Sequence, residues 1–289
     1  MDVVDAPAPR TRFAGPVWRV GVVVLGYVVA TLLVSVIVAP AHPRAMAAVP
    51  IGLALLAGLV ATAVLAPMSR RLRLATVPRA TVLALVAYLL STVSNDVEAV
   101  LFIRASSALV PLTGAILALA LTVPVAVLFP PEATDRGVGG LLRDTLASRP
   151  WWSWAWRLLV ASLAWVPVYL FFAALDAPFV HRYYHETGTA FTVPSTSVVM
   201  GAELARGVLH ALVLGMFVAL VARTRRGAWL AAALAFATFN AWLPLLQRTD
   251  WPAYLRTANA VEITCDALVY GGLVAVLLTR RRRRDPGTR

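Results

Sequence analysis

The sequence of 289 residues contains no lysine, so every one of its 26 basic residues is an arginine, and it has a single cysteine, Cys265. One cysteine excludes an intrachain disulfide and a cysteine-based metal site, so Cys265 is interpreted as a packing residue. Charged residues make up only 14% of the chain, apolar residues make up 60%, and the mean hydropathy is +0.77. This composition excludes a soluble globular domain, a disordered chain and a disulfide scaffold, and it predicts a protein of the lipid bilayer.

Apolar runs long enough to cross a bilayer, about 20 residues each, occur eight times. The predicted spans are 17–39, 46–67, 80–103, 107–129, 154–177, 196–222, 227–247 and 257–279. The longest polar gap, 130–153, is too short for an independent domain. We therefore predict an all-α fold, in which residues 1–289 form one integral membrane domain built as an eight-helix bundle. The first apolar run is longer than a secretory signal and is predicted to be an uncleaved first span.

The arginines predict an orientation. Sorted by alternate loops, 20 arginines lie on the side of the two termini, five lie on the other side, and Arg206 lies within a span. The positive-inside rule then places both termini in the cytoplasm. The expected location is the inner membrane of a bacterial cell. A formal charge of +12 would also suit a nucleic-acid binder, but it is spread over every cytoplasmic loop without exposed aromatic residues between, so no nucleic-acid partner is expected. Membrane lipids are the expected partners, and the run Arg280–Arg284 is read as an anchor that contacts anionic headgroups.

Two other patterns concern packing. Ala54, Gly58 and Thr62 recur at four-residue spacing, and the run 231–237 is rich in alanine, so both helices are predicted to pack closely against neighbours. A tryptophan cluster between residues 151 and 156 is typical of a membrane interface. Neither pattern indicates a catalytic or binding site.

Polar side chains within the spans indicate a functional site, because each costs several kcal/mol in a bilayer unless it is paired or hydrated. The candidate binding residues are Asn95, Asp96, Glu98, Glu203, Arg206, Asn240, Asn259, Glu262 and Asp266, with His210 beside them. With a rise of about 1.5 Å per residue, nearly all of them fall between the outer surface and the midplane. Their common depth predicts one shared polar region.

The helical spacing of these residues sharpens that prediction. Glu203, Arg206 and His210 lie at i, i+3 and i+7, and a second triplet, Asn259, Glu262 and Asp266, repeats the spacing. Asn95 and Glu98 share a face with Ser91. Three polar stripes predict a cavity that opens to the outside. Five carboxyl groups, those of Asp96, Glu98, Glu203, Glu262 and Asp266, then face the one guanidinium of Arg206. Some of them are expected to be protonated, to bind a cation or to be hydrated. The alternative is that the groups pair with one another and hold the helices together.

The sequence contains few residues suited to binding a metal or to nucleophilic catalysis. The chain has four histidines and no HExxH motif, so no zinc site and no cofactor is expected. The segment Ala202-Glu203-Leu204-Ala205-Arg206-Gly207, followed by Phe236-Ala237-Thr238-Phe239-Asn240, resembles the membrane-embedded CAAX-protease-like family, whose motifs are E-E-x-x-x-R-G and a later F-x-x-x-H. The tandem glutamate is missing here, the Glu-to-Arg spacing is three instead of four, and Asn240 replaces the histidine. The resemblance implies hydrolysis of a peptide or amide within the membrane, with Glu203 as the base that activates water; in an enzyme the catalytic candidates are Glu203, Arg206 and His210.

Residues 150–279 are also similar to polytopic bacterial membrane proteins without an assigned activity. The shared features are Trp156-Arg157, Asp176-Ala177-Pro178, Tyr183-Tyr184, Arg206-Gly207 and Asn259 to Glu262. This resemblance implies no function, but it suggests that the loop 178–195 belongs to the same outward-facing region.

Three functions fit these observations. The leading hypothesis is transport of a small solute or ion, or proton-coupled transport, in which Glu98, Glu203, Glu262 and Asp266 bind protons or a cation and Arg206 supplies the counter-charge. The second is an intramembrane enzyme, CAAX-protease-like or lipid-processing, that acts from the outer leaflet. The third is a subunit or assembly factor of a membrane complex. The sequence leaves the substrate, the coupling ion and the oligomeric state open.

Overall fold

A computed structural model describes residues 14–38, 49–103, 109–134, 137–185, 194–222 and 224–279. This described part is helical and contains no strand. Eight of its helices are long and apolar enough to cross a membrane: Val17–Ile37, Ile51–Arg71, Thr76–Leu101, Leu109–Leu128, Trp151–Val180, Thr196–Val221, Arg225–Gln247 and Ala253–Leu278. The chain is therefore an all-α, multi-pass membrane protein, as the sequence predicts.

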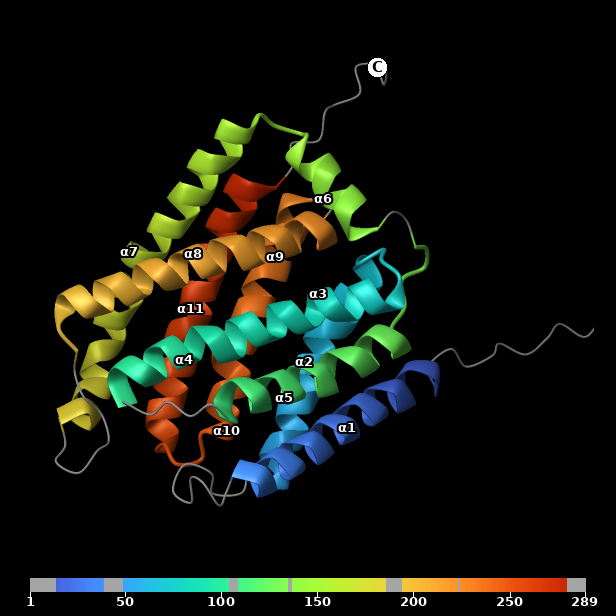
Figure 1. The fold of residues 1–289 in the computed structure, drawn as a ribbon. Helices are drawn as coiled ribbons and strands as arrows, with labels where there is room; N and C mark the ends of the chain where they lie inside the picture. Colours follow the sequence, from blue (N-terminus) through green and yellow to red (C-terminus); the bar gives the residue numbers. More distant parts are fainter. Residues whose placement is uncertain are drawn as a thin grey trace, which may run out of the picture.

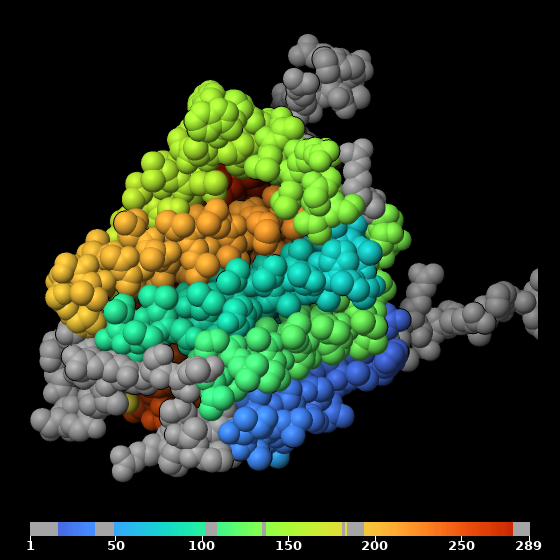
Figure 2. Space-filling model, in the orientation of Figure 1, coloured from blue at the N-terminus to red at the C-terminus, as the bar shows by residue number. Residues whose placement is uncertain are grey.

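The helices form a row with a second group behind it (Figure 1). Their bounds are α1 Ala14–Val38, α2 Ile51–Arg71, α3 Thr76–Tyr88, α4 Ser94–Glu98, α5 Leu109–Leu128, α6 Val138–Leu146, α7 Trp151–His185, α8 Thr196–Val221, α9 Arg225–Phe236, α10 Leu243–Gln247 and α11 Ala253–Leu278. The row runs α1, α5, α3 with α4, and α8, while α2, α9 and α11 cross behind it and α7 packs on α8 and α11. Figure 2 shows that side chains fill the space between the helices of the row.

Three π-helical segments interrupt the spans. Leu89–Val93 and Ala99–Ile103 flank α4, and Ala237–Trp242 joins α9 to α10. π-Helical turns are rare and frequently mark functional sites, because the wider turn changes the direction in which side chains point. The three polar residues predicted on the third span, Asn95, Asp96 and Glu98, lie in α4 between two of these segments, and Asn240 lies within the third.

Close helix packing occurs where the small residues predict it. A Cβ atom added to Gly58 of α2 would lie 3.3 Å from the ring of Tyr27 of α1. A Cβ atom added to Gly271 of α11 would lie 2.9 Å from the backbone nitrogen of Ala233 of α9. The predicted approach of these helices is thereby confirmed, and it rests on glycine facing a neighbour at each crossing.

Arginines hold one end of the bundle together; we name it the arginine-rich end, and the end at which α8 and α11 begin is the distal end. Arg79 is buried and donates to the carbonyls of Leu74 and Ala126, each over 2.6 Å. Arg149 donates to the carbonyls of Leu277 and Thr279, over 3.0 and 2.6 Å. Leu74 lies in the connection between α2 and α3, whereas Ala126, Leu277 and Thr279 lie at the ends of α5 and α11, where backbone carbonyls have no partner within the helix. The guanidinium groups therefore cap the helices as well as carrying the charge of this end.

The structure differs from the sequence-based expectation in two segments. α7 continues through Pro178 to His185, so residues 178–185 are helical where a loop was expected, and the remaining loop residues 186–193 lie outside the described residues. A proline removes only its own N–H from the helical ladder, and a long helix accommodates that loss. In the gap 130–153 the structure adds the short helix α6, which packs on α8 at the arginine-rich end.

Candidate functional site

Arg206 lies at the centre of the polar region, on the face of α8 that is turned into the bundle. Its Nη1 atom forms ion pairs with Glu98 and with Oε1 of Glu203, the latter over 2.8 Å. Its Nε atom donates to Oγ of Ser94 over 3.2 Å. Arg206 is 2% exposed and Glu203 is 1% exposed, whereas the side chain of Glu98 is 33% exposed. One guanidinium therefore joins α4 to α8 and lies beside a carboxylate that is open on one side.

The second oxygen of Glu203 is held from α7. Trp165, which is buried, donates its indole N–H to Oε2 of Glu203 over 2.8 Å. The Arg206 guanidinium carbon also lies 5.7 Å from the centre of the Trp165 ring, within the range of a cation–π contact. Both oxygens of Glu203 thus have donors, which satisfies a buried carboxylate without any contact to solvent.

Ser94 connects Arg206 to His210. The Oγ atom of Ser94 lies 2.9 Å from Nε2 of His210. Because a guanidinium can only donate, Ser94 accepts from Arg206, while the direction of its bond with His210 follows the tautomer of the imidazole. The Nδ1 atom of His210 is buried without a hydrogen-bond partner among the described residues. The rings of Trp165 and Phe236, both 4.6 Å away between centroids, enclose the imidazole.

Three further carboxyl groups lie beside this network. Asp176 of α7 and Glu262 of α11 lie close enough for their carboxyl groups to interact. Asp266, one turn further along α11, is 1% exposed and interacts electrostatically with Arg206, Glu203 and Glu98. We name the set of Glu98, Asp176, Glu203, Glu262, Asp266 and Arg206 the acid cluster. Tyr169 of α7 lies among its members, because it interacts electrostatically with four of them.

The members of the acid cluster have a common depth. Along the helix axes Glu203 lies about 10 Å from the start of α8 and Glu262 about 14 Å from the start of α11. Glu98 and Asp176 precede the distal ends of their spans by a turn or less. The cluster therefore lies in the half of the bundle nearer the distal end, away from most of the described arginines.

The structure brings together six of the ten residues that the sequence singled out: Glu98, Glu203, Arg206, His210, Glu262 and Asp266. The side-chain amides of Asn95 and Asn259 donate instead to carbonyls of their own helices, those of Ser91 and Leu255. The amide of Asn240 is buried and has no hydrogen-bond partner among the described residues. Within the described part of the chain, none of these three asparagines joins the contact network of the acid cluster.

Asp96 faces a different place from the acid cluster. It lines a pocket of about 610 Å³ between α4, α5 and α8, together with Tyr88, Val100, Pro111 and Gly201. Asp96 follows Asn95 and precedes Glu98 by two positions, so it points to another side of the helix. The three polar residues Asn95, Asp96 and Glu98 therefore do not share one face, and of them only Glu98 reaches Arg206.

The side chains around Arg206 are closely packed. His210 is fully buried, and Glu203 and Arg206 are almost so. The charges of Arg206 and Glu203 pair directly, and the ring of Trp165 packs edge-on against Phe236 and Tyr270. Among the described residues, no group of three or more histidine, cysteine, aspartate or glutamate side chains is placed to hold a metal ion.

Four residues of the site were not found by sequence reasoning: Ser94, Trp165, Tyr169 and Asp176. Ser94 lies four residues before Glu98, a spacing that puts both on one helix face and could have identified it. Asp176 stands at the predicted end of a span, where an acid is ordinary. Trp165 and Tyr169 lie in an apolar run, and no pattern there distinguishes a residue that binds a carboxylate from one that packs against lipid.

Comparisons of the chain with models of known protein families, with curated proteins and with solved structures gave no significant match. The class of the protein is therefore defined by its own fold and contacts: a multi-pass membrane protein with a paired acid cluster inside its helical bundle.

Proposed function

We propose that the protein is a proton-coupled transporter of a small solute, and that the acid cluster is its proton-binding site. The observation that carries the proposal is the surplus of acids over bases: five carboxyl groups share one guanidinium inside an apolar bundle. A buried carboxylate without a counter-charge costs several kcal/mol, so the negative charge in excess of Arg206 must be balanced by protons or by a cation. Arg206 is the fixed counter-charge in this scheme.

The contact of Asp176 with Glu262 supports protons as the balancing charge. The two carboxyl groups lie close together inside an apolar bundle, so ionising both would be costly, and we expect at least one of them to carry a proton. A metal cation has less support, because the carboxyl groups of the described residues are not gathered in threes around a common point. Proton binding at Asp176 and Glu262 is the simplest chemistry that uses this pair.

Exposure supports a route for the proton. The side chain of Glu98 is one-third exposed, Glu262 is half-buried, and Glu203 is closed off. Because Glu98 and Glu262 are accessible and the Arg206–Glu203 pair is not, a proton from the distal side would reach Glu98 and Glu262 more easily. Protonation of Glu98 would remove one of the two counter-charges of Arg206 and so weaken the link between α4 and α8. That link is the proposed coupling element.

The hydrolase implied by the CAAX-protease-like resemblance has less support from the geometry. Its base, Glu203, already accepts from Arg206 and Trp165 with both oxygens and is 1% exposed. Ser94 and His210 form a pair at 2.9 Å, but both are fully buried. A nucleophile or base must reach its substrate, so neither pair is arranged for catalysis in this conformation.

The test is solute-driven proton movement. Purified protein is reconstituted in vesicles that contain a pH-sensitive dye, and a panel of amino acids, sugars and organic acids is applied. We expect at least one solute to acidify or alkalinise the lumen, and we expect Glu98→Gln and Glu262→Gln each to abolish that signal. Asp96→Asn is the matched control, because Asp96 lies at similar depth outside the acid cluster and should retain the signal.

Infrared spectroscopy supplies a readout that needs no solute. The C=O stretch of a protonated carboxyl group should be present in the wild-type protein and lose intensity in Asp176→Asn and in Glu262→Gln, but not in Asp96→Asn. No solute response, together with an unchanged carboxyl band in the cluster variants, would overturn the proposal. Loss of thermal stability in those variants without any proton signal in the wild type would favour the role of a complex subunit.

We also propose that the arginine-rich end faces the cytoplasm of a bacterial cell and the distal end faces outward. The test uses single cysteines in a Cys265→Ala background, placed at Glu132 near the arginine-rich end and at Asp250 near the distal end. A membrane-impermeant maleimide applied to intact cells should label Asp250→Cys and should label Glu132→Cys only after lysis. The reverse pattern would invert the proposed orientation.

A further inference from the structure

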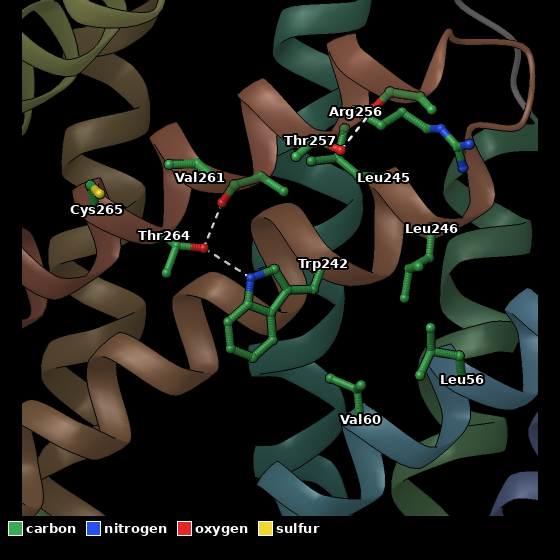
Figure 3. A pocket seen from close by; sticks show the side chains of 12 residues that line it. Leu56, Val60, Trp242, Leu245, Leu246, Arg256, Thr257, Val261, Thr264 and Cys265 are labelled. Carbon is green, nitrogen blue, oxygen red and sulfur yellow. Dashed lines mark hydrogen bonds between the residues drawn. The ribbon is translucent and has the colours of Figure 1, made fainter.

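A second pocket, of about 620 Å³, lies on the side of the bundle between α2, α10 and α11 (Figure 3). Its size falls in the range of ligand pockets, about 300–1,000 Å³. Most of its wall is aliphatic, and Leu56 and Val261 are 45% and 59% exposed on the outer surface of the bundle. In a membrane this surface meets lipid, so the pocket is open to the bilayer from the side.

The pocket is polar at one end only. Arg256 and Thr257 lie in the first turn of α11, at the distal end, and Val261 and Cys265 follow one and two turns deeper. From Arg256 to Cys265 the wall extends about 13 Å along the helix axis. Figure 3 shows Arg256 at the top of the pocket and Val60 at the bottom. The pocket thus has one cationic end at the membrane surface and an apolar trough that extends into the membrane.

Arg256 has no counter-charge in the described part of the chain. Its Nε atom is buried without a hydrogen-bond partner, and it forms no ion pair with a described residue. Arg248, at the same end, is instead paired with Asp250 at 3.1 Å. A partly buried guanidinium that lacks an anion is the group that binds a phosphate with two parallel hydrogen bonds.

The hydroxyl and indole groups in the trough are already satisfied. Thr257 donates to the carbonyl of Ala253 over 2.9 Å, and Thr264 donates to the carbonyl of Ala260 over 2.5 Å. Trp242 donates its indole N–H to Thr264 over 2.9 Å. Below Arg256 the described wall therefore offers apolar contact and no free donor, which suits an acyl chain and not a polar solute.

We propose that this pocket binds a membrane phospholipid with an anionic headgroup. The phosphate would lie against Arg256 at the distal surface, and one acyl chain would lie in the trough between Leu56, Val60 and Val261. A soluble anion would gain nothing from the trough, and a neutral lipid would leave Arg256 unpaired. The proposal concerns a different surface from the acid cluster and does not depend on transport.

The experiment measures which lipid stays with the purified protein. The protein is incorporated into nanodiscs that contain equal amounts of phosphatidylglycerol and phosphatidylcholine with the same acyl chains, and the retained lipid is identified by native mass spectrometry. We expect phosphatidylglycerol to be enriched about tenfold, and we expect Arg256→Gln to remove that enrichment, as for the loss of one charge-assisted contact. Arg248→Gln is the matched control and should leave the enrichment unchanged.

A second pair of variants tests the trough. Ala260→Phe places a ring in the pocket and should displace the lipid, whereas Val276→Phe, on an exposed part of α11 outside the pocket, should not. Equal enrichment in the wild type, Arg256→Gln and Ala260→Phe would overturn the proposal. So would an equal loss in Arg248→Gln, or full competition by glycerol phosphate, which has the anion but no acyl chain. Thermal stability of each variant identifies those that are folded.

Discussion

Trp165 donates its indole N–H to the Oε2 atom of Glu203 across 2.8 Å, and this bond links α7 to α8 at the acid cluster. Trp165→Phe keeps the ring but removes the donor, so we expect a loss of about 1.5–3 kcal/mol in the free energy of unfolding, the range for a hydrogen bond to a charged group. Thermal unfolding of the purified protein measures it. Trp152→Phe, at an exposed tryptophan, is the control and should change little. Equal melting temperatures for both variants would contradict the role given to Trp165.

Removal of Arg206 should be far more damaging than removal of a surface arginine. Arg206→Gln leaves Glu203 buried without its counter-charge, which costs about 3–5 kcal/mol for a buried pair. Arg248→Gln breaks an accessible pair and should cost about 0–1 kcal/mol. In the double variant Glu203→Gln with Arg206→Gln, part of the loss should be regained because no isolated charge remains at that pair. A double variant that is less stable than Arg206→Gln alone would argue against direct pairing.

Gly207 lets α8 approach α7 at the cluster. A Cβ atom there would collide with the backbone carbonyl of Ser162 and lie 3.1 Å from Cβ of Trp165, and neither is free to rotate away. Gly207→Ala should therefore destabilise the protein by about 1–3 kcal/mol, as overpacking does. Gly201, on the same helix, has no other atom within 4 Å of an added Cβ, so Gly201→Ala should be neutral or stabilising. The prediction fails if the two alanine variants have the same melting temperature.

The sequence predicts the helices well and the site in part, for physical reasons. A bilayer requires about 20 apolar residues in each span, so composition alone locates the eight helices. Buried acids are costly, so Glu98, Glu203, Glu262 and Asp266 stand out wherever they occur. Trp165 and Tyr169 do not stand out, since an aromatic residue in an apolar run has the same pattern whether it binds a carboxylate or packs against lipid.

The rotation of each helix is the part that spacing predicts least well. Asn95 and Asp96 are neighbours of Glu98, yet Asn95 bonds to its own helix and Asp96 faces another pocket. Which neighbour turns inward depends on the π-helical turns that flank α4, and a sequence pattern based on 3.6 residues per turn does not anticipate them. The lateral pocket at Arg256 depends likewise on how three helices diverge in space.

The absence of lysine leads to a fourth prediction. Arg79→Lys keeps the positive charge at the same end of α3, so orientation should be unchanged. A single ammonium group cannot replace the two nitrogen atoms that reach the carbonyls of Leu74 and Ala126, so stability should fall by about 1–3 kcal/mol. Arg143→Lys, at an exposed position, is the control. If Arg79→Lys melts with the wild type, the arginine at this position serves topology alone.

Arg19 and Arg149 are synthesised long before the carbonyl groups to which they bind. Arg19 bonds to the carbonyl of Leu128, 109 residues later, and Arg149 bonds to Thr279, 130 residues later. The acceptor of Arg19 lies at the end of α5 and the acceptors of Arg149 lie at the end of α11, so each bond forms only after the helices in between have been made. Of the described helices α11 comes last along the chain, and it supplies both carbonyls for Arg149, those of Leu277 and Thr279 at its end, and the acids Glu262 and Asp266. Loss of α11 would therefore remove contacts at the arginine-rich end and members of the acid cluster at the same time.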